Sequence, residues 1–133
     1  MKTLGVYVIT TIIFFAIDMI WLGLIAKSFY RQQLGFILSP DINWPAAIIF
    51  YILYIGGILF FAVMPGLKEH SWQTALLHGA VLGMLCYATY DLTNMATIKN
   101  WPLVIVVMDI IWGTMLTGGC ALLSYFTAIK LLD

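Results

Sequence analysis

Three aspartates interrupt the apolar stretches of this chain and are its strongest chemical signal. Asp18, Asp91 and Asp109 each lie inside a hydrophobic run rather than in a polar connection. An acid in the hydrocarbon core of a membrane costs about 2.5–3.5 kcal/mol on insertion scales, so it is by default a functional-site hypothesis. Several carboxylates held together in a medium of low dielectric cannot all carry charge. Such a group suits a proton, a metal ion or an organic cation.

Four hydrophobic runs must position these acids, and they cover residues of about 4–26, 46–64, 72–94 and 103–127. Each run approaches the ~20 residues that a helix needs to cross a bilayer. The chain has 133 residues, of which 63% are hydrophobic and 9% charged, which is more apolar surface than one soluble core of this size could bury. We therefore predict an all-α fold: residues 1–133 form a single membrane domain, a polytopic protein with four transmembrane helices in an antiparallel bundle.

With four spans, both termini are expected on one side of the membrane. The segment 28–44 and the turn near Lys99 are expected on the other side. The segment 28–44 mixes apolar and polar residues, so we expect it to extend the first helix and then to lie along the interface, either as a lid or as a plain connection. Each side carries three Lys or Arg side chains, and the N-terminal amine gives the side of the termini a slight excess of positive charge, which favours a cytoplasmic orientation for them.

The three acids lie at a similar depth when the spans are placed antiparallel. Asp18 is nine residues before Lys27, Asp91 is eight before Lys99, and Asp109 is seven after Pro102, distances on the order of 10–13 Å along a helix from the side of the 28–44 segment. Tyrosine, tryptophan and asparagine residues fall at the same level. The sequence therefore predicts one acidic, aromatic-lined pocket, with the following candidate residues: Asp18, Trp21, Tyr51, Tyr54, Tyr87, Tyr90, Asp91, Asn94, Asp109 and Trp112.

A repeated tripeptide suggests an internal duplication. Residues 43–45 and 100–102 both read Asn-Trp-Pro, and each precedes a hydrophobic run. Asparagine can cap a helix, tryptophan favours the membrane interface, and proline is tolerated in the first helical turn. Two tandem helical hairpins would explain the repeat. A shared preference of helices that begin at this interface would explain it equally.

Other functional classes lack support in the sequence. The chain contains no Cys/His cluster and no Glu-x-x-His pair of the kind that binds metal ions, and no phosphate- or dinucleotide-binding motif. We therefore expect no metal site and no cofactor. The formal net charge is zero, which argues against a nucleic-acid partner. The expected partners are the lipid bilayer and a small cation or amphiphile, and a homodimer is compatible with so small a chain.

Several of these residues together resemble a family of small bacterial membrane proteins with four spans and a domain of unknown function. The resemblance covers nearly the whole chain. Its most specific part is the run from Tyr87 to Asn94, and it continues in these segments: Asp18–Gly23, Phe29–Tyr30, Phe50–Tyr54 and Asp109–Gly113. The resemblance implies a multi-pass protein of the bacterial inner membrane. It implies no activity.

Three functions remain open on the sequence alone. The favoured one is a membrane protein that binds or translocates a proton, a cation or a small amphiphile in the acidic pocket, without catalysis. The first alternative is an intramembrane aspartyl enzyme in which Asp91 and Asp109 share a proton as a dyad. The second is a structural or accessory subunit in which polar side chains only hold helices together.

Overall fold

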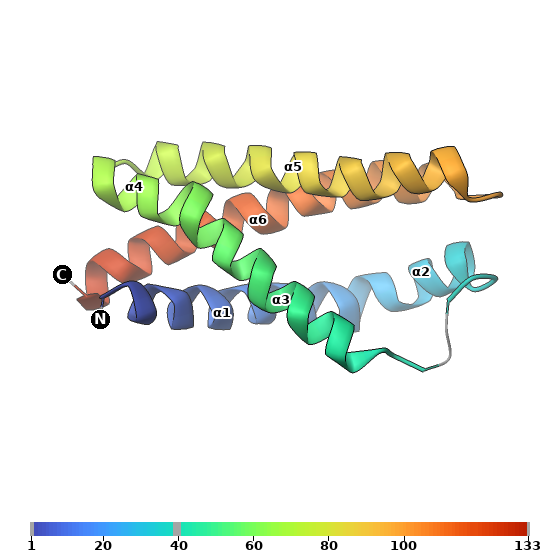
Figure 1. Cartoon of the computed structure of the whole chain (residues 1–133), viewed down its shortest axis with the longest axis horizontal. Coiled ribbons are helices and arrows are strands. Elements are labelled where there is room, and N and C mark those ends of the chain that lie inside the picture. The colour runs from blue at the N-terminus through green and yellow to red at the C-terminus, as the bar shows by residue number, and fades with distance from the viewer. Residues whose placement is uncertain (1, 39–40, 133) are drawn as a thin grey trace.

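The protein is a bundle of long helices, seen in a computed structural model that describes residues 2–38 and 41–132 (Figure 1). Within these ranges the regular structure is entirely helical. Four helical stretches are long and apolar enough to cross a membrane: Lys2–Leu24, Trp44–Glu69, Trp72–Thr97 and Leu103–Leu132. The all-α polytopic fold is thus confirmed. The first stretch begins and the last one ends at the same end of the bundle (Figure 1).

The first span belongs to a longer helical rod. Helix α1 (Lys2–Ile20) passes into a π-helical segment, η1 (Trp21–Ala26), and then into α2 (Lys27–Leu34). The helix therefore continues well into the segment 28–44, as the extension expected from sequence. Residues 39 and 40 of that segment lie outside the described ranges. Segments of π-helix are rare and occur frequently at functional sites.

The second span crosses the bundle obliquely. It consists of α3 (Trp44–Ile58), a second π-helical segment η2 (Leu59–Val63) and α4 (Met64–Glu69). Asn43 caps α3, because its side chain accepts a hydrogen bond from the amide of Ala46 at 3.3 Å. The start of α3 leans away from α5, whereas its end meets the bundle (Figure 1). Large apolar residues of the first half of α3 are accordingly exposed.

The third and fourth spans, α5 (Trp72–Thr97) and α6 (Leu103–Leu132), form the most extensive helix contact in the protein. Ser71 caps α5, and Asn100 turns the chain between the two helices with a left-handed φ of 64°. Asn43 and Asn100 thus have different roles in their tripeptides: the first caps a helix and the second forms a turn. A Cβ added at Gly83 would collide with the backbone of Gly113, so the small residues permit the close approach.

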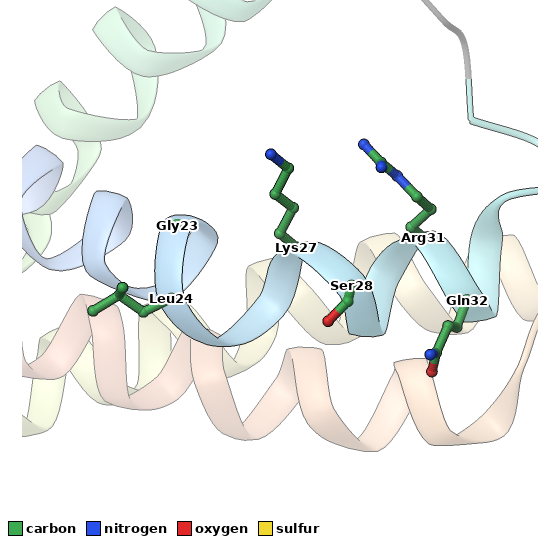
Figure 2. Close-up of a pocket in the computed structure, with 6 residues that line it drawn as sticks. All are labelled: Gly23, Leu24, Lys27, Ser28, Arg31 and Gln32. Atoms are coloured by element: carbon green, nitrogen blue, oxygen red, sulfur yellow. The ribbon is translucent and has the colours of Figure 1, made fainter.

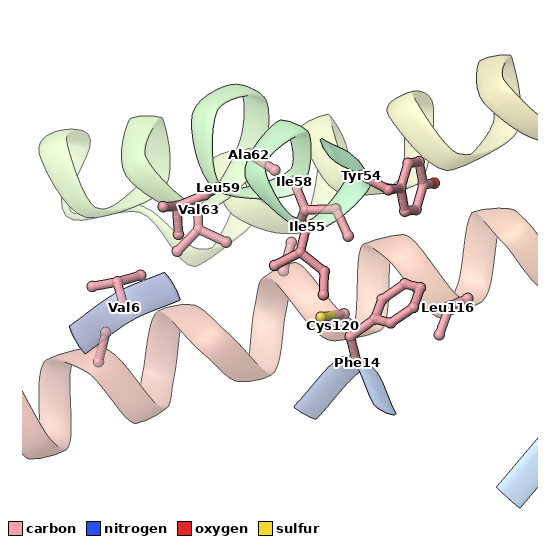
Figure 3. Close-up of a cluster of buried hydrophobic side chains, with 12 residues drawn as sticks. Val6, Phe14, Tyr54, Ile55, Ile58, Leu59, Ala62, Val63, Leu116 and Cys120 are labelled. Atoms are coloured by element: carbon pink, nitrogen blue, oxygen red, sulfur yellow. The ribbon is translucent and has the colours of Figure 1, made fainter. Parts of the chain in front are cut away.

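Two buried clusters hold the helices together. The larger joins α1, the α3–η2 span and α6 around Phe14, Ile55, Ile58 and Leu116 (Figure 3). The smaller joins α2 to the α5–α6 turn through Leu34, Trp101, Ile105 and Val106. The candidate site lies between these clusters, since it contacts residues packed against both.

Candidate functional site

An acidic cavity of about 240 Å³ opens between the first rod, α3, α5 and α6. It is lined by these residues: Phe14, Asp18, Trp21, Leu22, Tyr30, Phe50, Tyr51, Tyr87, Asp109 and Trp112. Two of the three aspartates, which are distant in sequence, therefore face the same space. Both are nearly buried, with exposures of 8% for Asp18 and 6% for Asp109.

Asp18 comes from the last turns of α1, just before η1. Among the described residues, its one hydrogen-bond partner is the hydroxyl of Tyr51 on α3, which donates to Asp18 Oδ2 over a long 3.4 Å. A bond of this length contributes little. The carboxyl group of Asp18 thus keeps acceptor capacity that a ligand in the cavity could use.

Asp109 comes from α6 and is held by a residue of α2. The hydroxyl of Tyr30 donates a hydrogen bond to Asp109 Oδ1. Burial, and then the bond to Asp109, raise the pKa of Tyr30 above its ordinary value, so this hydroxyl keeps its proton and stays a donor. The contact connects α2, which lies beyond the first span, to the first two turns of the fourth span.

Asp91 lies behind Asp109 rather than on the cavity wall. It has no exposed surface, and its Oδ1 accepts a bond from the indole Nε1 of Trp101 at 3.3 Å. Its Oδ2 has no hydrogen-bond partner within the described ranges. The carboxyl groups of Asp91 and Asp109 are close enough to interact with each other. Asp18 and Asp109 therefore line the cavity, whereas Asp91 is linked to it only through Asp109.

Aromatic rings form most of the remaining wall. The indoles of Trp21 and Trp112 stack with centroids 4.4 Å apart and planes 11° from parallel. Phe14 packs edge-on against Tyr51 at 5.9 Å. The negative faces of such rings attract cations, an effect that strengthens when water is excluded.

An apolar groove of about 450 Å³ adjoins the acidic cavity, between α3 and α5. Its lining consists of Phe50, Tyr54, Cys86, Tyr87 and Tyr90. Phe50 and Tyr87 line both spaces, so they form the boundary between them. The groove exists because α3 leans away from α5 along this stretch (Figure 1).

Four of the residues predicted for the pocket lie outside the acidic cavity. Asp91 is buried behind it, and Tyr54 donates to or accepts from Thr117 Oγ1 at 2.7 Å while its ring faces the apolar groove. Tyr90 is 55% exposed because a helix turns about 100° per residue, so an inward Asp91 sends its neighbour outward. Asn94 is half-buried one turn further along α5.

Two polar partners of the acids were missed by sequence reasoning. Tyr30 was assigned to an interfacial segment and Trp101 to the membrane interface, yet they are the donors to Asp109 and Asp91. The signal for Tyr30 was its position twelve residues after Asp18 in a segment that continues the helix. Trp101 could be found only by knowing how tightly the α5–α6 turn folds back. Phe14, Leu22 and Phe50 complete the wall as apolar residues without a polar signature.

The chemical capacity of the site is that of an acidic, aromatic-lined cavity. Within the described ranges, no group of three or more His, Cys, Asp or Glu side chains is arranged to hold a metal ion. The arrangement fits a ligand that donates hydrogen bonds or carries positive charge, with an apolar portion directed along the groove.

Comparison with known proteins gives one match. No curated protein and no solved structure matches the chain significantly. Residues 3–126 match the model of a family of membrane proteins of unknown function. Because this match spans nearly the whole sequence, the chain belongs to the family described as "Predicted membrane protein (DUF2177)".

Proposed function

We propose that this membrane protein binds a small amphiphile with a positively charged head. The head occupies the acidic cavity between Asp18 and Asp109, and the tail follows the apolar groove between α3 and α5. The observation that carries the proposal is that the two spaces adjoin: the cavity with the acids shares the lining residues Phe50 and Tyr87 with the groove.

The chemistry of the walls supports a cationic head. Asp18 and Asp109 supply negative charge or acceptor oxygens at low exposure, where electrostatic attraction is weakly screened. Trp21 and Trp112 add aromatic surface for cation–π attraction. A quaternary or primary alkylamine therefore matches the cavity better than an anion does.

The volumes of the two spaces support a ligand with an apolar tail. A cavity of about 240 Å³ holds a small head but is below the ~300–1,000 Å³ of most ligand sites. Together with the adjoining groove of about 450 Å³, the space falls within that range. An amphiphile uses both spaces, whereas a free ion uses only the first.

An intramembrane aspartyl enzyme is the second candidate. The observation that favours it is the proximity of Asp91 and Asp109, together with the unpartnered Oδ2 of Asp91. A hydrolytic dyad needs one water molecule in contact with both carboxyl groups. Asp91 has no exposed surface, so in this conformation a molecule in the cavity reaches Asp109 but not Asp91. Binding is therefore the better supported function.

The proposal is tested by thermal unfolding of the purified chain in a maltoside detergent. The probes are dodecyltrimethylammonium and, as a tailed anion, dodecyl sulfate at concentrations that leave the protein folded. A ligand that binds the native state raises the apparent stability by RT ln(1 + [L]/Kd). We expect dodecyltrimethylammonium to raise the Tm of the wild type and of Glu69→Gln, whose carboxyl group lies at the far end of the second span.

Asp18→Asn is the informative variant. It keeps the size and one acceptor oxygen of the side chain but removes the charge from the cavity, so the rise in Tm should be abolished or strongly reduced. Equal responses of Asp18→Asn and Glu69→Gln would contradict the proposal, as would a wild type that responds equally to the anionic probe. A loss of basal Tm in Asp18→Asn without any ligand response in either protein would favour the structural role instead.

A further inference from the structure

A second feature of the protein lies outside the acidic cavity, on the outer face of η1 and α2. A hollow of about 520 Å³ runs along this face and is lined by Gly23, Leu24, Lys27, Ser28, Arg31 and Gln32. These residues form two rows at helical spacing. Figure 2 shows Lys27 and Arg31 projecting to one side of the hollow and Ser28 and Gln32 to the other.

The face is uncovered because the opposite face of the same helix is buried. Tyr30 and Leu34 pack toward α5 and α6, and Ala26 is fully buried. On the outer face, a Cβ added at Gly23 would meet no atom within 4 Å, and Leu24 is 81% exposed. No helix of the described chain therefore occupies this surface.

The basic residues of the hollow have no acidic partner in the part of the chain that the structure describes. Neither Lys27 nor Arg31 forms an ion pair with any residue in the described ranges 2–38 and 41–132. They stand one helical turn apart, so their charges can converge on one anion. Arginine offers a planar fork of donors and lysine a mobile ammonium, the pair of groups that commonly binds phosphate. Ser28 and Gln32 add neutral hydrogen-bonding groups alongside.

The polarity of the hollow changes along its length. Gly23 and Leu24 lie at the end of the first span, and Arg31 and Gln32 lie about 10 Å further along the helix axis, beyond it. A phospholipid has the same order: acyl chains at membrane depth, then the phosphate at the interface. A soluble anion would match only the basic end.

We infer that the outer face of η1 and α2 binds an anionic phospholipid of the surrounding leaflet, with its phosphate between Lys27 and Arg31 and its acyl chain against Gly23 and Leu24. The attraction of basic residues to anionic lipid is an interfacial effect that salt weakens. This site is separate from the acidic cavity, so its failure would leave the proposed function standing.

The test is native mass spectrometry of the full chain, released from mixed micelles that contain phosphatidylglycerol or phosphatidylcholine. We expect the wild type to retain one phosphatidylglycerol molecule in preference to phosphatidylcholine. The double variant Lys27→Gln/Arg31→Gln should bind phosphatidylglycerol about 30-fold more weakly at low ionic strength, as expected for the loss of two basic residues near an anionic surface. The matched control is Lys68→Gln/Lys130→Gln, which removes two charges from the opposite end of the bundle.

Three outcomes would overturn the inference. The first is equal retention of the two lipids by the wild type. The second is an unchanged preference in the Lys27→Gln/Arg31→Gln variant, and the third is an equal loss in the control variant. Inorganic phosphate at millimolar concentration distinguishes the sources of the anion: full displacement of the lipid by phosphate would show a site for the free ion rather than for a lipid. A preference that persists in phosphate but declines with salt supports the lipid.

Discussion

The three aspartates differ in how completely the fold satisfies the hydrogen-bonding capacity of their carboxyl groups. Asp18 has one long hydrogen bond, Asp109 has the hydroxyl of Tyr30, and Asp91 has the indole of Trp101 on one oxygen only. A buried polar atom without a partner costs about 1–3 kcal/mol. The indole of Trp101 therefore limits the cost of burying Asp91.

The two tryptophans of the repeated tripeptide allow this role to be measured. Trp101 is 8% exposed and donates to Asp91, whereas Trp44 is 59% exposed at the start of α3. Trp101→Phe removes the hydrogen bond from the indole to Asp91 Oδ1, so we expect it to destabilise the fold by about 1–3 kcal/mol. Trp44→Phe should change stability little. Unfolding by dodecyl sulfate in mixed micelles, followed by circular dichroism, measures the free energy of unfolding of both variants. Equal losses of stability in the two variants would refute the role of Trp101.

The acids themselves could be predicted from sequence, whereas their partners could not. An aspartate in an apolar run is conspicuous whatever the fold, and equal depth follows from counting residues. Tyr30 and Asp109 are 79 positions apart, and their contact depends on the helix continuing beyond the membrane through η1. A tyrosine near a span end is also a common interfacial residue. Its residue type therefore did not distinguish an interfacial role from a role in the site.

At the scale of elements, the cavity depends on how α5 and α6 approach each other. Gly113 lies one turn after Asp109 on α6, and a Cβ added there would overlap the ring of Tyr87 from α5. The glycine thus lets this ring rest against α6, where it forms part of the wall of the cavity and of the groove. The absence of a side chain at Gly113 therefore makes room for the part of the cavity wall next to Asp109.

Two glycine substitutions on the same helix test this role. Gly113→Ala should displace Tyr87, destabilise the fold by about 1–3 kcal/mol through overpacking, and weaken the response to dodecyltrimethylammonium. Gly119→Ala is the control, because a Cβ there meets nothing within 4 Å. It should be neutral or slightly stabilising, since alanine favours helix over glycine by up to about 1 kcal/mol. The thermal unfolding assay reads both effects, and a Gly113→Ala protein that behaves like the control would be evidence against the tight contact.

The long elements were predictable from sequence, but their irregularities were not. Runs of apolar residues identify the spans because the bilayer sets their length. In α3, apolar residues lie on all sides, so the sequence carries no periodic signal for which face is buried or how the helix tilts. The oblique course of α3 and the two π-helical segments follow from packing against the other helices. The apolar groove, which depends on that course, was therefore absent from the sequence-based expectation.

At the scale of the whole molecule, the helices divide the protein into two ends with different chemistry. One end holds the start of α1, the end of α6 and the α4–α5 turn, and the other holds α2, the start of α3 and the α5–α6 turn (Figure 1). The lipid face proposed for α2 lies at the second end, and the acidic cavity lies toward it. We propose that the first end faces the cytoplasm of a bacterial inner membrane, on the slight excess of positive charge there and the resemblance noted above.

Cysteine labelling tests this topology. In a background without Cys86 and Cys120, single variants Lys68→Cys and Lys99→Cys present one thiol at each end of the bundle. With a membrane-impermeant maleimide on intact cells, Lys99→Cys should react and Lys68→Cys should react only after permeabilisation. The reverse pattern would invert the orientation, and equal labelling of both in intact cells would contradict a four-span arrangement.

The proposed function requires that the acidic cavity receives a cationic head while the groove receives its tail. An experimental structure of the protein with dodecyltrimethylammonium tests this most directly. We expect the trimethylammonium group between Asp18 and Asp109, beside the stacked indoles of Trp21 and Trp112, with the alkyl chain passing Phe50 and Tyr87. An ammonium group found on the lipid-facing surface, with the cavity filled by water or closed, would contradict it.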